Sequence, residues 1–209
     1  MSLPRMTFKP TPVPAAPNLN SPSAATNSQP KTIDQVADAL KKAFQNSSVL
    51  SVEKSHKGDP YVVVNADNLF EVIGFLRDDA AFQCQLLQCI SATDFLPLKA
   101  GETAPGASTP LEKDTDGRIE VLYALWSFTH RHQILVKVCL GRENPKIKSI
   151  CDFYRAANWY ERECWDLLGV IFEGHPDHQR ILLPPDWVGH PLRKDYVFPQ
   201  EYNGMKVPL

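Results

Sequence analysis

The apolar positions of the first half of the chain follow a helical rhythm in two segments, residues 33–44 and 69–76. Apolar residues that recur every three or four positions lie on one face of a helix. Thr32 and Gln35 form a capping-box pattern at the start of the first segment, and Asn65 or Asp67 can cap the second. The expected core-facing residues are Ile33, Val36, Ala37, Leu40, Ala43 and Phe44 in the first helix, and Leu69, Phe70, Ile73 and Leu76 in the second.

A period of two predicts strands in the segments between and after these helices. Residues 49–55 and 61–65 are expected to pair around a turn at Lys57–Pro60. Residues 85–95 are apolar on both faces, which predicts a central strand. Residues 118–130 and 133–140 form the clearest hairpin, because apolar residues alternate along both of them. His130 and His132 flank its turn and are predicted to be exposed to solvent.

The order of helix, two strands, helix and three strands predicts an α+β fold. We expect a mostly antiparallel sheet with helices packed on one face, formed by residues 32–171. Residues 97–117 are polar and rich in proline, glycine and alanine, and they are interpreted as a flexible insertion. Residues 1–31 are proline-rich and lack acidic residues, and they are interpreted as a disordered leader.

Two further helices are predicted before the C-terminal region. Ser149–Asp152 has the pattern of a cap for a short helix, and Asn158–Glu161 has that pattern for a helix of about ten residues. Gly169 stands where a left-handed residue ends such a helix. The apolar face of the second helix is expected to hold Tyr160, Cys164, Leu167, Leu168 and Ile171.

The last segment, residues 172–209, is too rich in proline for a helix and too apolar to remain solvated. Its prolines include Pro176, Pro184, Pro185 and Pro191. Long segments without regular structure are often functional or bind a partner. We therefore interpret residues 172–209 as an extended C-terminal arm that lies on another protein.

Composition narrows the classes of function. The 209 residues are 43% hydrophobic and 22% charged, with a formal net charge of -2. A surface that binds nucleic acid or anionic lipid needs a basic excess, which is absent. No apolar run is long enough to cross a bilayer. The five cysteines form no CxxC pair and are expected to be reduced, buried thiols.

Several carboxylates and histidines suggest catalysis or metal binding, but their spacing favours neither. Glu161 and Glu163 point to nearly opposite sides of a helix, whereas Glu163 and Asp166 can share a face. We expect Glu161 to cap the helix and Arg162 to pair with Asp166. His175, His178 and His190, with Cys164, allow a metal site, but Pro176 disrupts the geometry that would aim the first two together. Phosphate-binding and dinucleotide-binding glycine patterns are also absent, so we expect no catalytic, cofactor or metal residue in this chain.

A family resemblance is carried by three nearby motifs: ERECWDLLGVIFEGHP at 161–176, RILLP at 180–184 and DWVGHPLRKDY at 186–196. They resemble the signature of the C subunit of proton-pumping NADH-quinone oxidoreductase, respiratory complex I. The match is dense over residues 149–196 and looser back to Thr32. The leader, the insertion and His178–Gln179 depart from the usual family pattern.

The resemblance implies a non-catalytic scaffold in the peripheral arm of complex I. Other subunits would hold the FMN, the iron–sulfur clusters and the quinone, through which electrons pass from NADH in a reaction coupled to proton translocation. The main partner would be the large subunit that helps to form the quinone site. The implied location is the cytoplasmic side of a bacterial inner membrane, without a membrane span, or else the matrix side of the mitochondrial inner membrane.

The expected partner contacts lie in the signature helix and the C-terminal arm. Arginine and large aromatic residues are typical of interface hot spots. The candidates are Glu161, Arg162, Glu163, Asp166, His175, Arg180, Trp187, His190, Arg193, Lys194, Asp195 and Tyr196. Two other interpretations stay open at this point: the equivalent subunit of a related membrane-bound hydrogenase, and a stand-alone metal-dependent enzyme.

Overall fold

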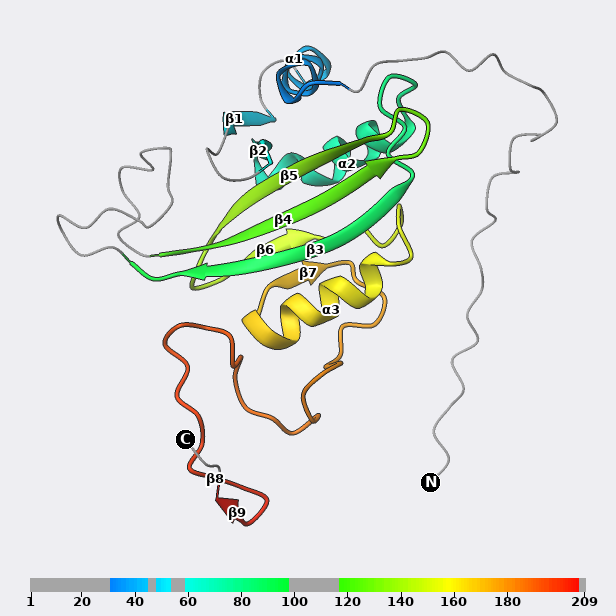
Figure 1. Ribbon diagram of the computed structural model, residues 1–209. Coiled ribbons are helices and arrows are strands. Elements are labelled where there is room, and N and C mark those ends of the chain that lie inside the picture. The colour runs from blue at the N-terminus through cyan, green and yellow to red at the C-terminus, as the bar shows by residue number, and fades with distance from the viewer. Residues whose placement is uncertain (1–30, 45–47, 54–58, 98–116, 207–209) are drawn as a thin grey trace.

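The computed structural model describes residues 31–44, 48–53, 59–97 and 117–206 (Figure 1). The leader, most of the predicted insertion and the turn at Lys57 lie outside these residues. In chain order the elements are α1 (Ile33–Ala43), β1 (Val49–Glu53), β2 (Tyr61–Val64), the 3-10 turn η1 (Ala66–Asn68), α2 (Leu69–Asp78), β3 (Leu86–Phe95), β4 (Arg118–Ser127), β5 (His132–Gly141), β6 (Lys146–Lys148), α3 (Ala157–Leu168), β7 (Ile171–Glu173), β8 (Glu201–Tyr202) and β9 (Met205–Lys206).

Five strands form the main sheet in the order β1-β2-β5-β4-β3. All neighbours are antiparallel except β2 and β5, which run parallel. The α+β class with a mostly antiparallel sheet is therefore confirmed. The predicted hairpin is formed by β4 and β5, which pair along their full length from Arg118 opposite Gly141 to Ser127 opposite His132.

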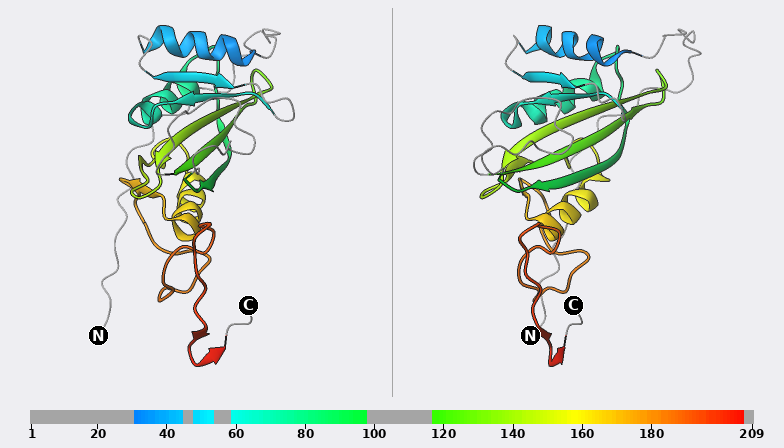
Figure 2. Two further views of the ribbon diagram at one scale, coloured as in Figure 1. Left: turned by 90° about the vertical axis from the view of Figure 1, so that its left-hand side faces the viewer. Right: turned by 60° about the vertical axis from the view of Figure 1, so that its left-hand side comes forward.

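One face of this sheet and the apolar stripes of the helices form a single core (Figure 2). Alternate residues of β4 and β5 are buried, as the period of two predicts. The fully buried core side chains include Leu40, Val62, Leu69, Ile73, Leu76, Ile119, Tyr123 and Leu125. Thr32 and Gln35 form the predicted capping box of α1. Phe70 is only partly buried, and its ring instead packs on Phe153 at a centroid distance of 4.4 Å.

The prediction that residues 85–95 form a central strand is wrong, because β3 lies at the edge of the sheet. Its apolar residues do not form two buried faces: a register shift between Leu87 and Cys89 places Leu87 and Ile90 both in the core, whereas Leu86 is 38% exposed.

Side chains of α3 cover the edge of the strand. The Tyr160 hydroxyl donates to Gln88 O at 2.7 Å, and the Cys164 thiol donates to Ile90 O at 3.8 Å. An edge strand offers unpaired backbone groups, and here side chains of α3 occupy two of them.

Two local predictions are also corrected. His132 is 5% exposed, because it is the first core-facing residue of β5 rather than part of the turn. Residues 151–153 form a turn, not a helix, and the Ser149 hydroxyl accepts from Cys151 N within it.

The small sheets β6-β7 and β8-β9 were not predicted. The β8-β9 hairpin turns at Asn203 and Gly204, both with positive φ. Asn-Gly is a strong signal for a two-residue hairpin turn, so this element was detectable in the sequence.

Two tyrosine hydroxyls near β3 offer a matched test of this packing. Tyr154 donates to Cys84 O at 2.6 Å in a buried setting, whereas the contact of Tyr160 with Gln88 O is exposed. We expect Tyr154→Phe to lower the free energy of unfolding by about 1–3 kcal/mol, because it leaves a buried carbonyl unpaired. Tyr160→Phe should cost about 1 kcal/mol or less. Urea denaturation measures both, and equal losses would contradict the assignment of a buried hydrogen bond.

Candidate functional site

The described part of the C-terminal arm, residues 172–206, wraps around the C-terminal end of α3 at the end of the molecule opposite α1 (Figures 1 and 2). This region holds most of the residues that the sequence motifs single out. Helix α3 begins after Ala156, which makes no side-chain cap, and ends at Gly169 with φ of 77°. The predicted end at Gly169 is therefore confirmed, and the predicted cap at Asn158 is wrong.

The C-terminal arm supplies hydrogen-bond donors to the last carbonyls of α3. A helix leaves four carbonyls without an internal partner at this end. The first of these carbonyls, Trp165 O, accepts a hydrogen bond from Gly169 N. The arm takes the other three: Asp166 O accepts from Arg180 and His190, Leu167 O from Leu192 N, and Leu168 O from Arg193 Nε at 2.7 Å. The cationic Arg180 and Arg193 also complement the negative end of the helix dipole.

The Asp166 side chain accepts four hydrogen bonds from the arm. It is fully buried, and its Oδ1 accepts from Arg180 Nη1 at 2.6 Å. Its Oδ2 accepts from three consecutive backbone amides, those of Ile181, Leu182 and Leu183, at 2.8–3.0 Å. Burial opposes ionisation, but these hydrogen bonds outweigh it and lower the pKa of Asp166. Asp166 is therefore a carboxylate that fixes the backbone of the arm.

Two arginines extend this network along the arm. Arg180 also donates to Trp187 O and Gly189 O, so it joins α3 to the second half of the arm. Arg162 donates to Gln179 O and Arg180 O at 3.0 Å, and its Nη1 lies 3.5 Å from Asp177. The predicted pair of Arg162 with Asp166 is therefore replaced by the pair of Arg180 with Asp166.

Gly169 lies where the arm approaches the helix most closely. A Cβ atom added there would lie 2.6 Å from His190 Cδ2 and 2.9 Å from Arg193 Nη2. Its positive φ already favours glycine. This position therefore combines a backbone requirement with a packing requirement.

A second anchor holds the arm against the main sheet. Arg142, which follows β5, makes a bidentate pair with the buried Asp94 of β3 and donates to Asp195 at 2.5 and 3.1 Å. The backbone N–H of Lys194 donates to Asp94 Oδ2 at 2.8 Å. Burial opposes ionisation of Asp94, yet Arg142 and Lys194 N lower its pKa below the ordinary value. The hydrogen bonds with Asp94 and Asp195 raise the pKa of Arg142.

Glu161 occupies a separate buried position on α3. Its oxygens accept from Ser149 Oγ at 2.6 Å, Ile150 N at 2.8 Å and Cys151 Sγ at 3.5 Å. Burial raises the pKa of Glu161 to about 7 and that of the Cys151 thiol to about 12. Glu161 thus holds the turn before α3 rather than capping the helix.

The histidines of the arm make separate structural contacts. His175 donates from Nε2 to Asn158 O and accepts from Asp177 N at Nδ1. His178 accepts from Phe172 N and packs on Trp165 at 4.6 Å, and His190 donates to Asp166 O. Burial lowers the pKa of all three, which keeps them neutral at neutral pH.

The metal site that the sequence allows is not assembled by these contacts. Cys164 donates to Ile90 O, away from the histidines. Within the described ranges, the one cluster of metal-type ligands is Cys151, Glu161 and His175, whose ligand atoms lie within 4.8 Å of one another. Nε2 of His175 carries the proton that it donates to Asn158 O, so it has no lone pair for a metal. The hydrogen bonding of this cluster therefore opposes metal binding.

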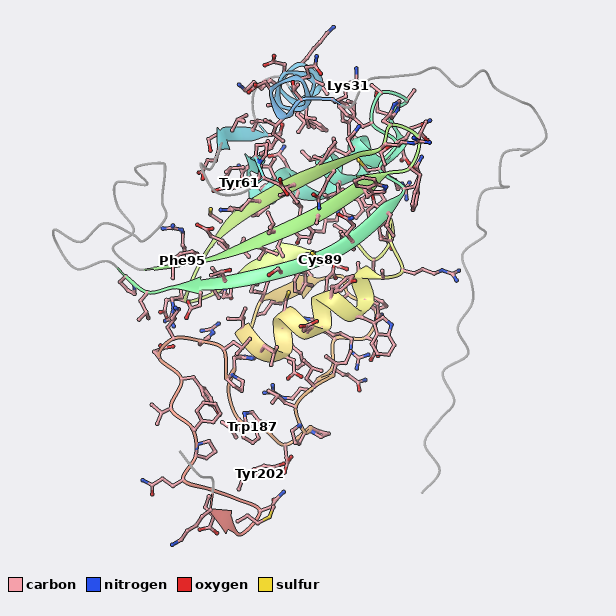
Figure 3. All side chains as sticks on the ribbon, viewed as in Figure 1. Lys31, Tyr61, Cys89, Phe95, Trp187 and Tyr202 are labelled. Atoms are coloured by element: carbon pink, nitrogen blue, oxygen red, sulfur yellow. The ribbon has the colours of Figure 1, made fainter. Side chains whose placement is uncertain are left out.

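Large apolar side chains of the arm face solvent, whereas Arg180, His190 and Arg193 bond to α3. Val188 is 83% exposed and Val197 is 85% exposed. Trp187 packs on Tyr202 at 5.0 Å near the end of the arm (Figure 3), and the Tyr196 hydroxyl donates to Val188 O. The outward apolar residues, which we call the apolar ridge, are Leu182, Val188, Leu192, Val197, Phe198 and Met205.

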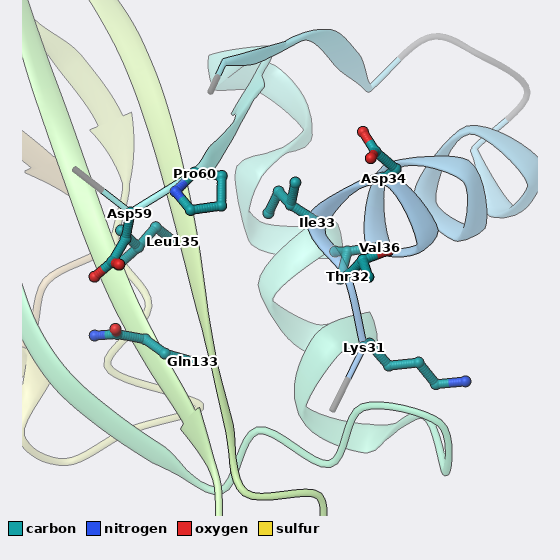
Figure 4. A pocket seen from close by; sticks show the side chains of 9 residues that line it. All are labelled: Lys31, Thr32, Ile33, Asp34, Val36, Asp59, Pro60, Gln133 and Leu135. Carbon is teal, nitrogen blue, oxygen red and sulfur yellow. The ribbon is translucent and has the colours of Figure 1, made fainter. Parts of the chain in front are cut away.

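A groove lies between α1 and the sheet (Figure 4). It has a volume of about 450 Å³, which lies within the range of ligand pockets. Its two carboxylates, Asp34 and Asp59, come from opposite walls, and its lining contains no histidine or cysteine. This groove therefore presents no pair of nucleophile and base.

The structure divides the twelve predicted interface residues into groups by burial. Glu161 and Asp166 are fully buried and bonded within the chain, whereas Glu163, Lys194 and Asp195 are exposed. The remaining seven are half-buried as whole residues, although the His175 side chain itself is fully buried: Arg162, His175, Arg180, Trp187, His190, Arg193 and Tyr196. The partner contacts of all twelve stay a prediction. Sequence reasoning missed Asp94 and Arg142, because pairing between residues 48 positions apart leaves no local pattern.

Comparison with known proteins places this fold and its signature in one family. The family described as "Respiratory-chain NADH dehydrogenase, 30 Kd subunit" matches residues 62–202. The chain therefore belongs to this family of respiratory-complex subunits. Its curated relatives are named as the C subunit of NADH-quinone oxidoreductase. The relative from Salinispora tropica is 35% identical over 88% of this chain and 71% of its own length. That from Chloroherpeton thalassium is 32% identical over 93% of this chain and 74% of its own length.

Solved structures share the fold. A trypsin-resistant fragment of Nqo5 is similar with a TM-score of 0.50 and 25% identity, covering 68% of this chain and 98% of the fragment. A chain of the membrane-bound sulfane sulfur reductase, an archaeal respiratory membrane complex, has a TM-score of 0.50 at 20% identity, covering 77% of this chain and 85% of its own. This second likeness shows the fold alone. No helix among the described residues is long and apolar enough to span a bilayer.

Gly169 allows a direct test of how the arm is attached. We expect Gly169→Ala to lower the free energy of unfolding by about 2–4 kcal/mol, since it adds a collision with His190 and Arg193 to the left-handed backbone cost. Gly174→Ala is the matched control, because Gly174 also has a positive φ but nothing lies within 4 Å of its added Cβ. It should cost only about 1–2 kcal/mol.

Urea denaturation measures these losses, and limited proteolysis detects release of the arm. The Gly169→Ala variant alone should be cleaved faster between residues 175 and 196. Equal behaviour of the two variants would contradict the close approach of the arm to α3.

Proposed function

We propose that this subunit is a non-catalytic scaffold of the peripheral arm of NADH-quinone oxidoreductase, and that its C-terminal arm binds the large quinone-site subunit. The observation that supports the proposal is that the C-terminal arm bonds to its own chain on one side and exposes apolar side chains on the other. Arg180, His190 and Arg193 bond to α3 and Asp195 bonds to Arg142, while the apolar ridge faces outward. Exposed apolar surface on an ordered segment is typical of a protein interface.

The chemistry of the described residues supports a role without catalysis. The buried carboxylate of Asp166 is fully occupied by hydrogen bonds, and Glu161 bonds to neutral groups of its own chain. Burial raises the pKa of the Cys164 thiol to about 12, and that of Cys151 is equally high, so neither is a reactive thiolate. The FMN, the iron–sulfur clusters and the quinone would then be held by other subunits.

The proposed location is the cytoplasmic side of a bacterial inner membrane, where membrane subunits of the complex would hold this chain. Its cysteines, all free, fit a reducing compartment. The matrix side of a mitochondrial inner membrane has the same chemistry and is the alternative. The names of the curated relatives favour the NADH-linked complex over a related hydrogenase.

Single substitutions on the apolar ridge test the proposed interface. We expect Val188→Ser or Val197→Ser to weaken binding to the co-expressed large subunit about tenfold, because each removes apolar area that would be buried in the complex. Both side chains are more than 80% exposed in the isolated chain, so its stability should not change. Affinity is measured by co-purification and by titration of the purified partners.

The matched control is Phe128→Ser, because Phe128 is 63% exposed but follows β4, away from the C-terminal arm. It should bind the large subunit as the unaltered chain does. These variants test the interface more cleanly than a deletion from residue 189 onward, which would also remove the donors to Leu167 O and Leu168 O. Normal binding by both valine variants would contradict the proposal.

A further inference from the structure

Helix α3 carries two fully buried carboxyl groups in contrasting surroundings. Glu161 and Asp166 are both 0% exposed. An ionised carboxylate is stable in such a position only when a cation or several strong donors compensate its charge. Where neighbouring carboxyls have different environments, those environments separate their protonation states.

Asp166 has the compensation that an anion needs. Arg180 pairs with one oxygen, and three backbone N–H groups converge on the other. These hydrogen bonds favour the ionised form of Asp166 and lower its pKa.

Glu161 is surrounded by neutral groups. Its three donors are the Ser149 hydroxyl, the Ile150 amide and the Cys151 thiol. In the part of the chain that the structure describes, no lysine or arginine bonds to it. His175 Nε2 lies 4.0 Å away, but both nitrogens of this ring are engaged as in a neutral imidazole, and burial lowers its pKa.

The other ionisable groups near Glu161 add no positive charge. Asp152, on the turn, opposes a second negative charge at this position. Tyr123 of β4 and Cys164 of α3 are buried, and the charge of Glu161 acts on both of them. The Tyr123 hydroxyl is itself buried without a hydrogen-bond partner among the described residues. None of these neighbours is a cation. Burial, which is the largest effect, and the charge of Asp152 favour the uncharged form of Glu161, and they outweigh the three hydrogen bonds that favour the charged form.

We propose that Glu161 is a proton-binding site that takes up and releases one proton near neutral pH, while Asp166 on the same helix remains an anion. Its raised pKa, about 7 as a result of burial, agrees with this assignment. The ligand is the proton itself, bound to a carboxylate oxygen.

Protonation would change the contacts of the turn before α3. A protonated Glu161 oxygen becomes a donor, whereas Oε2 now accepts from Ser149 Oγ and Cys151 Sγ and Oε1 accepts from Ile150 N. The oxygen of Ser149 is the nearest group that can accept, although it now donates to Glu161 and accepts from Cys151 N. The proton on Glu161 is therefore coupled to the conformation of residues 149–151.

The direct test is a pH titration of the full-length chain by infrared spectroscopy, with glutamate labelled by ¹³C. We expect one protonated glutamate carboxyl band with a midpoint near pH 7, lost in Glu161→Gln. Glu163→Gln is the matched control on the same helix, because Glu163 is exposed and should leave the band unchanged. The absence of any protonated glutamate above about pH 5 would overturn the proposal.

A second measurement follows from linkage. Folding raises the pKa of Glu161 from 4.5 to about 7, so folding takes up a proton between these values. The stability that the neutral group contributes is complete below pH 4.5 and is lost as the pH rises through about 7. From pH 5 to pH 8 the unfolding equilibrium constant of the unaltered chain should therefore rise roughly 100-fold relative to that of Glu161→Gln. Parallel profiles would contradict the proposal.

Cobalt(II) distinguishes a proton site from a metal site. We expect no thiolate-to-cobalt absorption when Co²⁺ is added to the full chain, because His175 and Cys151 both retain their protons. A cobalt–thiolate band that disappears in Cys151→Ser and removes the carboxyl band would replace the proton site with a metal site. If Glu161→Gln does not fold, the titration of the unaltered chain still decides between these outcomes.

Discussion

The buried carboxylate of Asp166 accepts hydrogen bonds from Arg180 and from three consecutive amides, and the course of the C-terminal arm depends on this cluster. A helix end and an irregular segment each have backbone groups that need partners. Here the end of α3 and the C-terminal arm supply hydrogen-bond partners to each other. Removal of Asp166 would leave Arg180 without its carboxylate and three amides without their acceptor. Loss of this one side chain would therefore be strongly destabilising.

This arrangement changes the account of the C-terminal arm that its composition suggested. Its prolines and apolar residues predicted an extended segment that lies on another protein. In the structure Arg180, Arg193 and His190 bond to α3, and Asp195 bonds to Arg142, so the chain itself provides the contacts that order the arm. The apolar ridge is then presented on a segment that is already shaped. An ordered segment loses less conformational entropy on binding, which favours assembly of a multi-subunit complex.

The sequence was a good guide where local patterns decide the structure. The capping box at Thr32, the hairpin of β4 and β5 and the helix end at Gly169 all follow from short-range rules. It was a poor guide where distant residues meet. The double apolar pattern of β3 reflects a register shift between Leu87 and Cys89 in a strand at the sheet edge, and the alternation rule does not separate this case from a central strand. Likewise, the burial of Glu161 depends on the turn at Ser149, which a helical wheel cannot show.

The same limit applies to the candidate site. The signature motifs identified the family, and they also contain the residues that hold the C-terminal arm. The sequence analysis, however, predicted that the polar residues of these motifs contact a partner. Polar residues of this kind have two uses that look alike in sequence, bonding within the chain and bonding across an interface. Burial and hydrogen bonds separate them: Asp166 and Arg180 act within the chain, and the outward candidates are chiefly apolar, such as Val188 and Val197.

Amide hydrogen exchange of the isolated, full-length chain tests most directly whether the chain itself orders the arm. The amides of Ile181, Leu182 and Leu183 donate to Asp166, and that of Leu192 donates to Leu167 O. We predict that these four amides exchange slowly in the absence of any partner. Exchange as fast as in an unstructured peptide, with protection only after the large subunit binds, would contradict the account.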